Sequence, residues 1–440
     1  MKVTIICPSF YDANNNLFKT DAATLPPLTI YYLAGMVPAH HTVQVIDESV
    51  AEIDFDKPTD LVAITSTSVN IRRAYEIAKE FKARDTPVVL GGIHASVKKE
   101  EALEYVDAVV IGEAEDSWPQ LLIDAENRQL KKVYNAPARD SIENLPLPRF
   151  DLIDSDKYVK FPFLKGHIVP IQTARGCPHK CSFCSVTEFW GAKMRYRPIA
   201  DIVQEVIHSK GDTFFFTDDN FLMHPQRTIE LCQELSKLNI KFICQIDSIY
   251  SEKRIKVLDA LAKAGCFMVY IGLESVDPKR LLSMNKKFNK PEKYNELIAA
   301  LKKRRISTYA SIILGLEGDD LNTVDYTVTF LIKCKVGMAA FFPITPFPGT
   351  ALFDDLKKKN LLRQDKWWLT LGEPGSENLV DFPANQYTEC ELSERANRDF
   401  YSLSSMIKRL IRIDSNFLLP LMFNIVAKKR LKGSGNLTKL

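Results

Sequence analysis

Three cysteines stand close together near the middle of the chain, in the run RGCPHKCSFC. Cys177, Cys181 and Cys184 have the spacing C-x3-C-x2-C, behind a glycine and directly after a predicted strand. Thiolates hold iron–sulfur clusters, and three from one short loop would leave the fourth iron of a cubane open to a small chelating ligand. The alternative is ordinary buried or zinc-binding cysteines. A structural zinc ion needs a fourth ligand, and His179 lies too close within the loop to supply it easily.

The other cysteines are scattered in apolar contexts, and we expect them to be core residues: Cys7, Cys232, Cys244, Cys266, Cys334 and Cys390. A total of nine cysteines in 440 residues argues against a secreted disulfide framework. The N-terminus has no cleavage site of a signal peptide, and no apolar run reaches the length of a membrane span. The net charge of +3 is too small to indicate nucleic-acid binding. We therefore expect a cytoplasmic α/β protein.

Around the cysteines, short apolar runs alternate with helical patterns in two series. The first series predicts strands that are buried on both faces, and hence a doubly wound, flavodoxin-like parallel sheet. Its strands are predicted over residues 2–7, 42–46, 61–65, 87–90 and 108–111, with a helix over 70–82. Such a sheet binds its ligand at the carboxyl ends of its strands. We expect this domain to span residues 1–135, followed by a proline-containing linker over 136–165.

The second series predicts six β–α repeats, which together form a partial or complete barrel over residues 166–353. Strands are predicted over 168–173, 214–217, 242–246, 268–272, 307–314 and 339–344, and helices over 199–208, 225–238, 252–264, 291–303 and 322–334. The remainder, residues 354–440, is predicted to be mainly helical.

The cysteine triplet, with an aromatic residue before its last cysteine, resembles the signature of radical S-adenosylmethionine (SAM) enzymes. The resemblance implies a [4Fe-4S] cluster held by Cys177, Cys181 and Cys184, whose open iron chelates SAM. It also implies a partial (β/α)6 barrel, reductive cleavage of SAM to a 5′-deoxyadenosyl radical, and an external electron donor such as flavodoxin or ferredoxin. In these enzymes the cofactor carries the difficult chemistry and the protein positions it.

Segments at later strand ends add to this resemblance, in the order that the family keeps. GLES at 272–275, ILGLEG at 313–318 and TPFPGT at 345–350 are similar to family segments at the SAM site. The residues expected near SAM are Asp218, Asp219, Asn220, Gln245, Asp247, Glu274, Ser275 and Leu314. Singly, each of these could be a helix cap or turn residue. Arg197 matches a family position beside the cluster, and an ordinary ion pair is nearly as good an interpretation.

The N-terminal series resembles the cobalamin-binding domains that precede some radical SAM barrels. The segments that carry this likeness are LPPL at 25–28, TSTS at 65–68, VLGGIHAS at 89–96 and AVVIGEAE at 108–115. Glycines after a strand let a flat macrocycle or a nucleotide tail approach the backbone. The residues expected to contact cobalamin are Ser9, Ser66, Thr67, Ser68, Gly91, Gly92, Ile93, His94, Gly112 and Glu113.

One feature departs from many cobalamin proteins: the loop after the first strand, PSFYDAN, contains no histidine. Bound cobalamin would then be base-off without a histidine ligand to cobalt. His94 is not in the ligand motif, and we expect it at the surface or against the corrin edge.

The C-terminal residues 400–432 combine helical apolar spacing with a basic edge. Two interpretations stay open, a helix pair packed on the barrel and an interfacial segment that touches anionic lipid and presents a hydrophobic substrate.

Taken together, the two resemblances imply an enzyme that uses SAM both as methyl donor and as radical source, to methylate an unactivated carbon. The substrate would be a small molecule such as a lipid or a tetrapyrrole. One alternative keeps both domains but performs cyclisation, oxidation or C–C bond formation without methyl transfer. Another is a non-catalytic cobalamin or iron–sulfur sensor.

Overall fold

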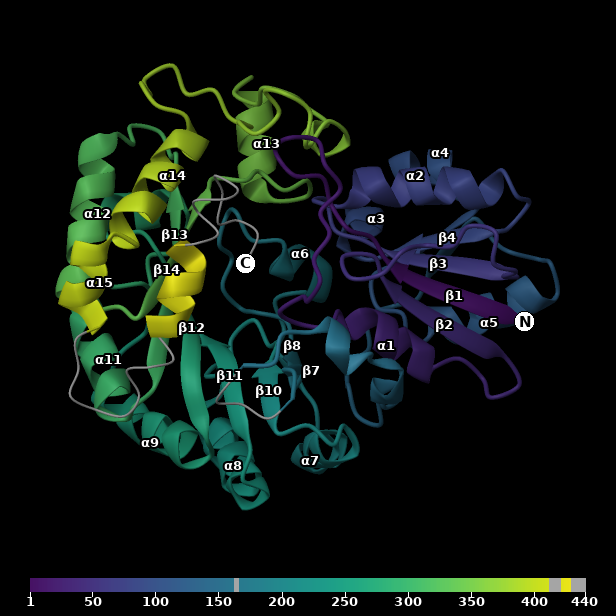
Figure 1. Ribbon diagram of the computed structural model, residues 1–440, viewed down its shortest axis with the longest axis horizontal. Coiled ribbons are helices and arrows are strands. Elements are labelled where there is room, and N and C mark those ends of the chain that lie inside the picture. The colour runs from purple at the N-terminus through teal and green to yellow at the C-terminus, as the bar shows by residue number, and fades with distance from the viewer. Residues whose placement is uncertain (162–165, 411–420, 429–440) are drawn as a thin grey trace.

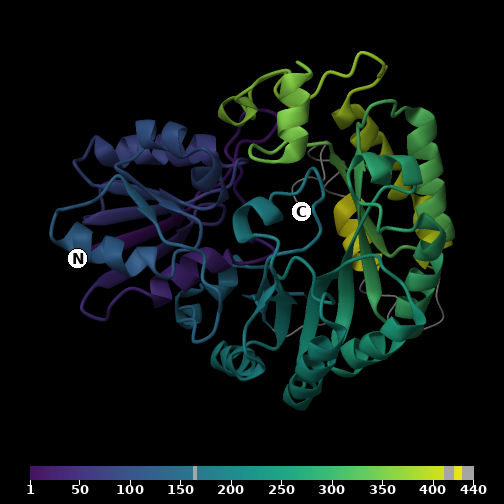
Figure 2. The ribbon, with the colours of Figure 1, turned by 180° about the vertical axis from the view of Figure 1, so that it is seen from behind.

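The computed structural model describes residues 1–161, 166–410 and 421–428, and the chain forms two α/β units that lie side by side (Figure 1). Each unit is built on a parallel sheet of six strands. Both sheets are covered by helices, which is why their strands consist of nearly continuous apolar runs. The same division into two units is visible from behind (Figure 2).

The first sheet has the strand order β2-β1-β3-β4-β5-β6. Its strands are β1 (Lys2–Cys7), β2 (Thr42–Asp47), β3 (Leu61–Thr65), β4 (Val88–Gly91), β5 (Ala108–Ile111) and β6 (Val133–Asn135). This is the flavodoxin-like doubly wound order with one added edge strand, so the predicted fold of this part is confirmed. The added strand β6 was not predicted, because only one of its three residues, Tyr134, is buried.

Helices cover both faces of the first sheet and enclose two separate apolar cores. They are α1 (Leu28–Gly35), α2 (Ile71–Lys82), α3 (Ile93–Val97), α4 (Lys99–Tyr105) and α5 (Ser117–Glu126). In Figure 1, α2 and α4 lie on one side of this sheet and α1 lies on the other. The amphipathic pattern of residues 70–82 therefore predicts α2 and its buried face correctly.

The second sheet has the order β14-β13-β12-β11-β10-β7, and its outer strands β7 and β14 do not pair within the described residues. Its strands are β7 (Val169–Ile171), β10 (Thr213–Phe216), β11 (Lys241–Ile246), β12 (Cys266–Glu274), β13 (Ser307–Leu314) and β14 (Met338–Pro343). Six strands in sequence order, all parallel, form a partial (β/α)6 barrel, as predicted.

Five of the six helices that connect the barrel strands follow the predicted ranges closely, whereas the short helix over 278–283 was not predicted. The six are α7 (Ile199–His208), α8 (Pro225–Leu235), α9 (Ile255–Lys263), α10 (Pro278–Ser283), α11 (Pro291–Lys303) and α12 (Leu321–Lys333). The one helix predicted over 225–238 ends at Leu235 and continues as a 3-10 turn to Leu238. Between β7 and α7 lie the antiparallel pair β8 (Ala174–Arg175) and β9 (Arg195–Tyr196) and the short helix α6 (Val186–Trp190), none of which was predicted.

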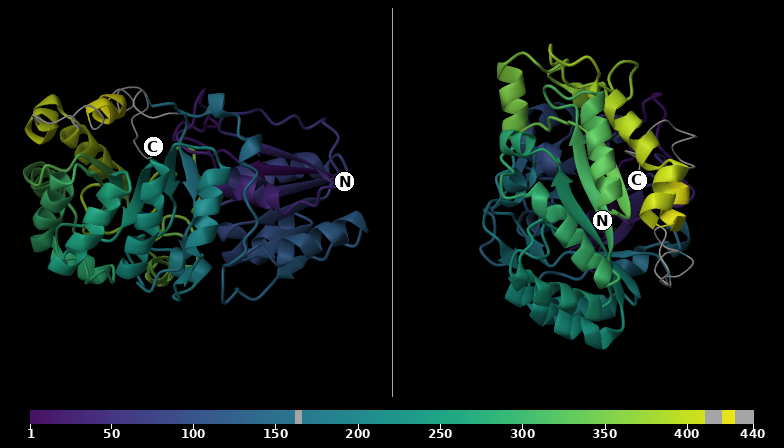
Figure 3. Two further views of the ribbon diagram at one scale, coloured as in Figure 1. Left: turned by 90° about the horizontal axis from the view of Figure 1, so that it is seen from below. Right: turned by 90° about the vertical axis from the view of Figure 1, so that its left-hand side faces the viewer.

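The C-terminal helices lie along the side of the barrel that faces away from the first sheet (Figure 3). After α13 (Ala351–Lys358) they are α14 (Glu389–Phe400), α15 (Leu403–Leu410) and a helical stretch over 421–428. The buried guanidinium of Arg409 fixes α15 by donating to the carbonyls of Val336 and Gly337. The interpretation as a helix pair packed on the barrel is therefore confirmed for the described part of residues 400–432. Much of the predicted apolar and basic edge (411–420 and 429–432) lies outside the described residues.

The segment between α13 and α14 returns to the first sheet and connects the two units a second time. Trp367 and Trp368 are buried in the same apolar core as helix α2. The indole of Trp368 donates to Glu101 of α4 at 2.9 Å. Within the described part of the chain, no helix has both the length and the apolar character needed to cross a membrane.

Candidate functional site

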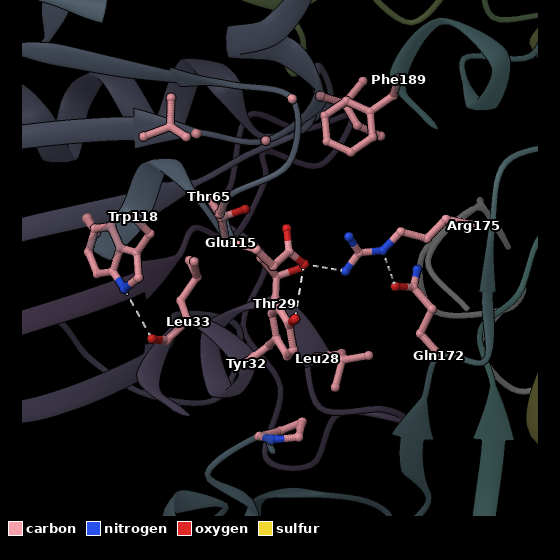
Figure 4. A pocket seen from close by; sticks show the side chains of 18 of the residues that line it. Leu28, Thr29, Tyr32, Leu33, Thr65, Glu115, Trp118, Gln172, Arg175 and Phe189 are labelled. Carbon is pink, nitrogen blue, oxygen red and sulfur yellow. Dashed lines mark hydrogen bonds and ion pairs between the residues drawn. The ribbon is translucent and has the colours of Figure 1, made fainter. Parts of the chain in front are cut away.

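The loops at the carboxyl ends of β3, β4 and β5 line a cavity that is closed on its far side by the barrel. From the first sheet come Ser66, Thr67, Gly91, Gly92, Ile93 and Gly112, and from the barrel come Gln172, Arg175 and Trp190. Figure 4 shows Arg175 reaching across to Glu115, which Tyr32 also contacts, while Gln172 lies against Arg175. The cavity contains about 1220 Å³ of atom-free space, its open mouth included. Two domains therefore contribute to one site.

Two features of the cavity wall fit a large, hydrogen-bonding ligand such as cobalamin. The Ser66 hydroxyl is buried and has no hydrogen-bond partner among the described residues. A buried hydroxyl without a partner is unfavourable unless a ligand or water completes its hydrogen bond. Gly112 has a φ of +69°, and a Cβ at this position would meet nothing within 4 Å. The wall is thus open at the glycine, where a macrocycle or its side chains can approach the backbone.

Gly92 has a different role, because it packs against the neighbouring loop. A Cβ at Gly92 would lie 2.4 Å from the carbonyl oxygen of Ser66, and its φ is +100°. This glycine therefore permits the close contact between the loops after β3 and β4. Any side chain here would force the loops after β3 and β4 apart.

Four of the residues predicted to contact cobalamin lie outside the cavity wall: Ser9, Ser68, His94 and Glu113. The amide of Ser9 donates to Glu48 at 3.0 Å, and its hydroxyl donates to the carbonyl of Phe18. The predicted position of His94 at the surface is wrong, because its side chain is fully buried. It bonds Ser68 at 2.9 Å and Glu101 at 3.3 Å. Burial lowers the pKa of His94 despite the opposing effect of Glu101.

Glu113 belongs to a buried ion-pair network that crosses from the first sheet to the barrel. Arg175 contacts Glu113 at 2.7 Å and Glu115 at 2.5 Å, while Arg195 contacts Glu113 at 2.5 Å. The Tyr32 hydroxyl donates to Glu115 at 3.0 Å. Two carboxylates and two guanidinium groups balance, so their charges can be buried at the domain boundary. Arg175 opens the run RGCPHKCSFC, but its role in this network was not predicted. Its position directly before the cysteine motif was the available signal.

The cysteine loop is held in place by the short β8–β9 pair and by α6. Gly176 has a φ of +91°, and a Cβ there would lie 2.3 Å from the carbonyl oxygen of Lys193. Only glycine allows the chain to turn so tightly into the motif. Cys177, Cys181 and Cys184 are half-buried and free.

The three thiols fit a cluster better than a single metal ion. Each interacts electrostatically with another thiol of the triplet, so they gather in one place. Among the described residues, His40, His41 and Glu126 place three ligand atoms within 4.8 Å of one another. The three cysteine sulfurs do not form such a group, so at least one pair of them lies more than 4.8 Å apart. Tetrahedral zinc with bonds of about 2.3 Å would bring sulfurs to about 4 Å from one another. Wider spacing is what a multi-iron core between them requires.

Burial raises the pKa of all three cysteine thiols, that of Cys184 to about 11. Thiols with raised pKa values are protonated at neutral pH, so binding of iron to these cysteines would displace their protons.

The carboxylates after β10 have two different roles. Asp218 is buried and accepts hydrogen bonds from the amides of Thr173 and Ala174, at 2.5 and 3.1 Å. It thus fixes the backbone that leads into the cysteine loop. Asp219 turns the other way and interacts electrostatically with Cys177 and Cys184. Burial, with the neighbouring charge of Asp218, raises the pKa of Asp219 to about 7.

The predicted residues after β10 and β11 meet in one polar network. The Asn220 amide donates to Asp247 at 2.8 Å, and the Arg254 guanidinium pairs with the same carboxylate. The Gln245 side chain donates to the carbonyl of Asp219 at 3.2 Å. These contacts hold the two strand ends side by side.

At the end of β12, Glu274 has a φ of +60° and accepts hydrogen bonds from Lys286 at 2.8 Å and from Ser311 at 3.2 Å. Ser275 accepts from the amide of Asp277 at 3.1 Å, so it caps the following turn. Leu314 is buried in the barrel core. Arg197 forms a buried ion pair with Glu205 at 2.6 Å, which agrees with the ion-pair interpretation.

Comparisons with known proteins agree with this geometry. The radical SAM superfamily pattern matches residues 171–331, and the B12 binding domain pattern matches residues 17–122. Bacteriochlorophyllide d C-8(2)-methyltransferase of Chlorobaculum tepidum is 30% identical over 349 residues, which cover 76% of this chain and 77% of that protein. Anaerobic magnesium-protoporphyrin IX monomethyl ester cyclase of Rubrivivax gelatinosus is 30% identical over 400 residues, or 82% of this chain and 70% of the cyclase.

The fold also matches a solved structure. The radical SAM methyltransferase TsrM from Kitasatospora setae, with cobalamin and a [4Fe-4S] cluster bound, superposes with a TM-score of 0.68 at 16% identity, covering 94% of this chain and 91% of that one. The fold, the two matched domains and the level of identity agree on one assignment. The chain belongs to the radical SAM superfamily, among the enzymes that carry an N-terminal cobalamin-binding domain.

Proposed function

We propose that the protein methylates an unactivated carbon of a small organic molecule, with SAM as methyl donor and as radical source. When bound, the cluster supplies the electron that cleaves SAM to a 5′-deoxyadenosyl radical, and cobalamin carries the methyl group. The relatives that carry out C-methylation of tetrapyrroles support this reaction class.

The observation that carries the proposal is the shared cavity. Gln172 and Arg175 lie in the segment that leads into Cys177, and they line the same space as Gly91, Gly92 and Gly112 of the first sheet. A ligand in this cavity would lie next to whatever the cysteine loop holds. Reactions that use two cofactors on one substrate need this proximity.

We assign the site residues accordingly. Cys177, Cys181 and Cys184 would hold the cluster, and the cavity residues Ser66, Thr67, Gly91, Gly92, Ile93 and Gly112 would contact cobalamin. Asp219, Gln245 and Glu274, at the carboxyl ends of adjacent strands, would face SAM. Asp218, Asn220 and Asp247 would hold the strand ends in register. Ser9, Ser68, His94 and Glu113 are assigned to the scaffold of the first domain.

The substrate is proposed to be a flat, largely apolar molecule such as a tetrapyrrole. Aromatic side chains point from successive barrel strands into one apolar cluster. The rings of Tyr270 and Tyr309 lie 4.5 Å apart, and Phe215 lies 5.6 Å from Tyr270. Such a wall can stack against a planar ring. The bacteriochlorophyllide methyltransferases among the relatives support the same class.

The test is anaerobic reconstitution with iron, sulfide and hydroxocobalamin, followed by reduction in the presence of SAM with a labelled methyl group and candidate tetrapyrroles. We expect both 5′-deoxyadenosine and S-adenosylhomocysteine, and label in the product. The Cys177→Ala variant should make no deoxyadenosine. The matched control Cys390→Ala, which alters a half-buried cysteine in α14, should retain it. Deoxyadenosine formation by Cys177→Ala would overturn the cluster assignment.

A second candidate is cyclisation or oxidation without methyl transfer. The magnesium-protoporphyrin ester cyclase, which is 30% identical over 400 residues, favours it. In the same assay this reaction would give deoxyadenosine without S-adenosylhomocysteine and without label in the product.

We also propose an external low-potential electron donor of the flavodoxin or ferredoxin type and a cytoplasmic location. Peripheral membrane contact is a further part of the proposal. Leu403 and Ile407 lie four residues apart on α15 and are 64% and 57% exposed, next to the exposed Lys408. Sedimentation with vesicles that contain anionic lipid tests this contact, and no binding at low salt would exclude it.

A further inference from the structure

A buried lysine lies against the cysteine loop, and the proposed function gives it no role. Lys286 is only 9% exposed, and its ammonium lies 2.8 Å from Glu274 at the end of β12. The same ammonium lies 5.7 Å from the ring centre of Phe183, which stands between Cys181 and Cys184. Burying an ammonium group is costly unless its charge is matched by partners. Its position therefore calls for an explanation.

The segment that carries Lys286 is bonded to the cysteine loop. The amide of Ser182 donates to the carbonyl of Met284 at 3.0 Å. The side chain of Asn285 donates to the carbonyl of Lys180 at 2.6 Å. These two bonds, on either side of Cys181, fix the distance between the lysine backbone and the motif.

The same segment is bonded to the end of β12. The Asn289 amide donates to the carbonyls of Gly272 and Leu273, each at 2.9 Å. A Cβ at Gly272 would lie 2.5 Å from the Glu274 carboxylate and 2.9 Å from the Lys286 ammonium. The ion pair therefore rests directly on this glycine. Lys286 is held at both ends and has little freedom to move away.

The ammonium presents its charge to Cys181 more strongly than Glu274 presents the opposite charge. Lys286 interacts electrostatically with Cys177, Cys181 and Cys184. For Cys181 its effect exceeds that of Glu274. The other charged groups that act on this side of the barrel are Asp219, Asp247 and Arg254, together with the neutral ring of His179. Arg254 is paired with Asp247, whereas Lys286 is the cation whose segment is bonded directly to the cysteine loop.

We propose that Lys286 is a positioning residue of the cluster site, whose fixed positive charge raises the reduction potential of the cluster. This inference rests on the cluster assignment made above. When one electron passes from a low-potential donor protein to the cluster, the cluster gains one negative charge and no bond forms or breaks. A nearby buried cation stabilises that added charge, because solvent screens it weakly. The lysine also orients Glu274 toward the SAM side of the strand ends.

The test is a redox titration of the reconstituted protein without SAM, in which the EPR signal of the reduced cluster is measured at each potential. Lys286→Met should lower the ratio of reduced to oxidised cluster at a fixed potential at least about tenfold, which corresponds to 59 mV for a one-electron couple. Lys286→Arg, which keeps the positive charge, should have the same reduction potential as the wild type. The matched control Lys287→Met removes the adjacent, exposed lysine and should leave the potential unchanged.

A second variant avoids an unpaired buried carboxylate. The double change Lys286→Met with Glu274→Gln removes both charges, and its potential should lie between those of Lys286→Met and the wild type. Wild-type potentials in both variants would overturn the proposal. If neither variant holds four irons while Lys287→Met does, the lysine serves cluster assembly and the tuning role is overturned. Iron and sulfide content of the wild type separates this result from a failure of the cluster assignment itself.

Discussion

The carboxyl edges of the two sheets face the same space but are built from different chemistry. The edge of the first sheet presents backbone, glycines and small hydroxyls, as at Ser66, Thr67 and Gly112. The edge of the barrel presents three thiols, several carboxylates and the ammonium of Lys286. One edge suits a large ligand that is recognised by shape and hydrogen bonds. The other suits a charged metal core and a zwitterionic partner.

This difference explains where the molecule places its buried ion pairs. The first-sheet residues that line the cavity at Ser66–Thr67 and Gly91–Gly92 carry no charge. The charged side chains of this region lie instead where the first sheet meets the barrel. There Arg175 and Arg195 neutralise Glu113 and Glu115. We infer that this ion-pair network fixes the position of the neutral edge, which is that of the first sheet, relative to the charged edge of the barrel.

The largest effect is expected when this boundary is broken. Arg175→Met leaves Glu113 and Glu115 buried with too few partners, which should cost about 3–5 kcal/mol of unfolding free energy. Chemical denaturation followed by tryptophan fluorescence measures it. The variant should also bind hydroxocobalamin more weakly, because Arg175 lines the cavity.

The matched control is Arg139→Met, which removes a partly exposed arginine that pairs with Asp116 in two contacts. This variant should lose only about 0–1 kcal/mol of unfolding free energy, which is typical when an exposed ion pair is removed. Equal stability losses in the two variants would show that the buried network does not hold the edges together.

A smaller effect is expected at the second connection, where Glu101 meets the C-terminal segment. Burial opposes the charged form of Glu101, but hydrogen bonds from His94, Trp368 and Lys366 outweigh it and hold its pKa at about 2. The unfolded chain therefore takes up this proton at a higher pH than the folded chain. The stabilisation is present above the ordinary value of 4.5 and is lost as the pH falls toward 2.

Glu101→Gln should consequently cost about 1–3 kcal/mol at pH 7, and the difference from the wild type should shrink as the pH falls below 4.5. Urea denaturation at several pH values measures this. Glu104→Gln, on the exposed face of the same helix, is the control and should show no such trend. A difference for Glu101→Gln that does not change with pH would contradict the assigned bonds.

Most of the fold could be predicted from the sequence, because its main strands lie within nearly continuous apolar runs that alternate with helical patterns. All eleven predicted strands occur, and the unpredicted β6, β8 and β9 have only two or three residues each. Strands this short carry too few apolar positions to produce a periodic pattern. Their positions depend on tertiary contacts, as when the β8–β9 pair closes around Gly176.

The site could be predicted only as far as local spacing determines it. The cysteine motif and the polar residues after each strand are visible in the sequence. The direction of each side chain within a loop is not, which is why His94 was expected outside and lies inside. Lys286 and Arg175 act through partners that are 12 and about 60 residues away, Glu274 for the lysine and Glu113 and Glu115 for the arginine. Such distant pairs leave no periodic signal.

The smallest predicted effect separates the two faces of one loop. Ser66 lines the cavity and has no hydrogen-bond partner in the described part of the chain, whereas Ser68, two residues later, bonds the buried His94. Ser66→Ala should weaken hydroxocobalamin binding about 2- to 10-fold with little loss of stability, since one hydrogen bond contributes about 0.5–1.5 kcal/mol. Ser68→Ala should do the reverse, because it leaves the His94 ring nitrogen unpaired in the core and does not touch the ligand. Absorbance titrations and thermal unfolding of both variants give a crossed comparison, in which each variant is the control for the other. If Ser68→Ala weakened binding and Ser66→Ala did not, the ligand would lie on the opposite face of the loop, and the neutral edge described above would not be the cobalamin site.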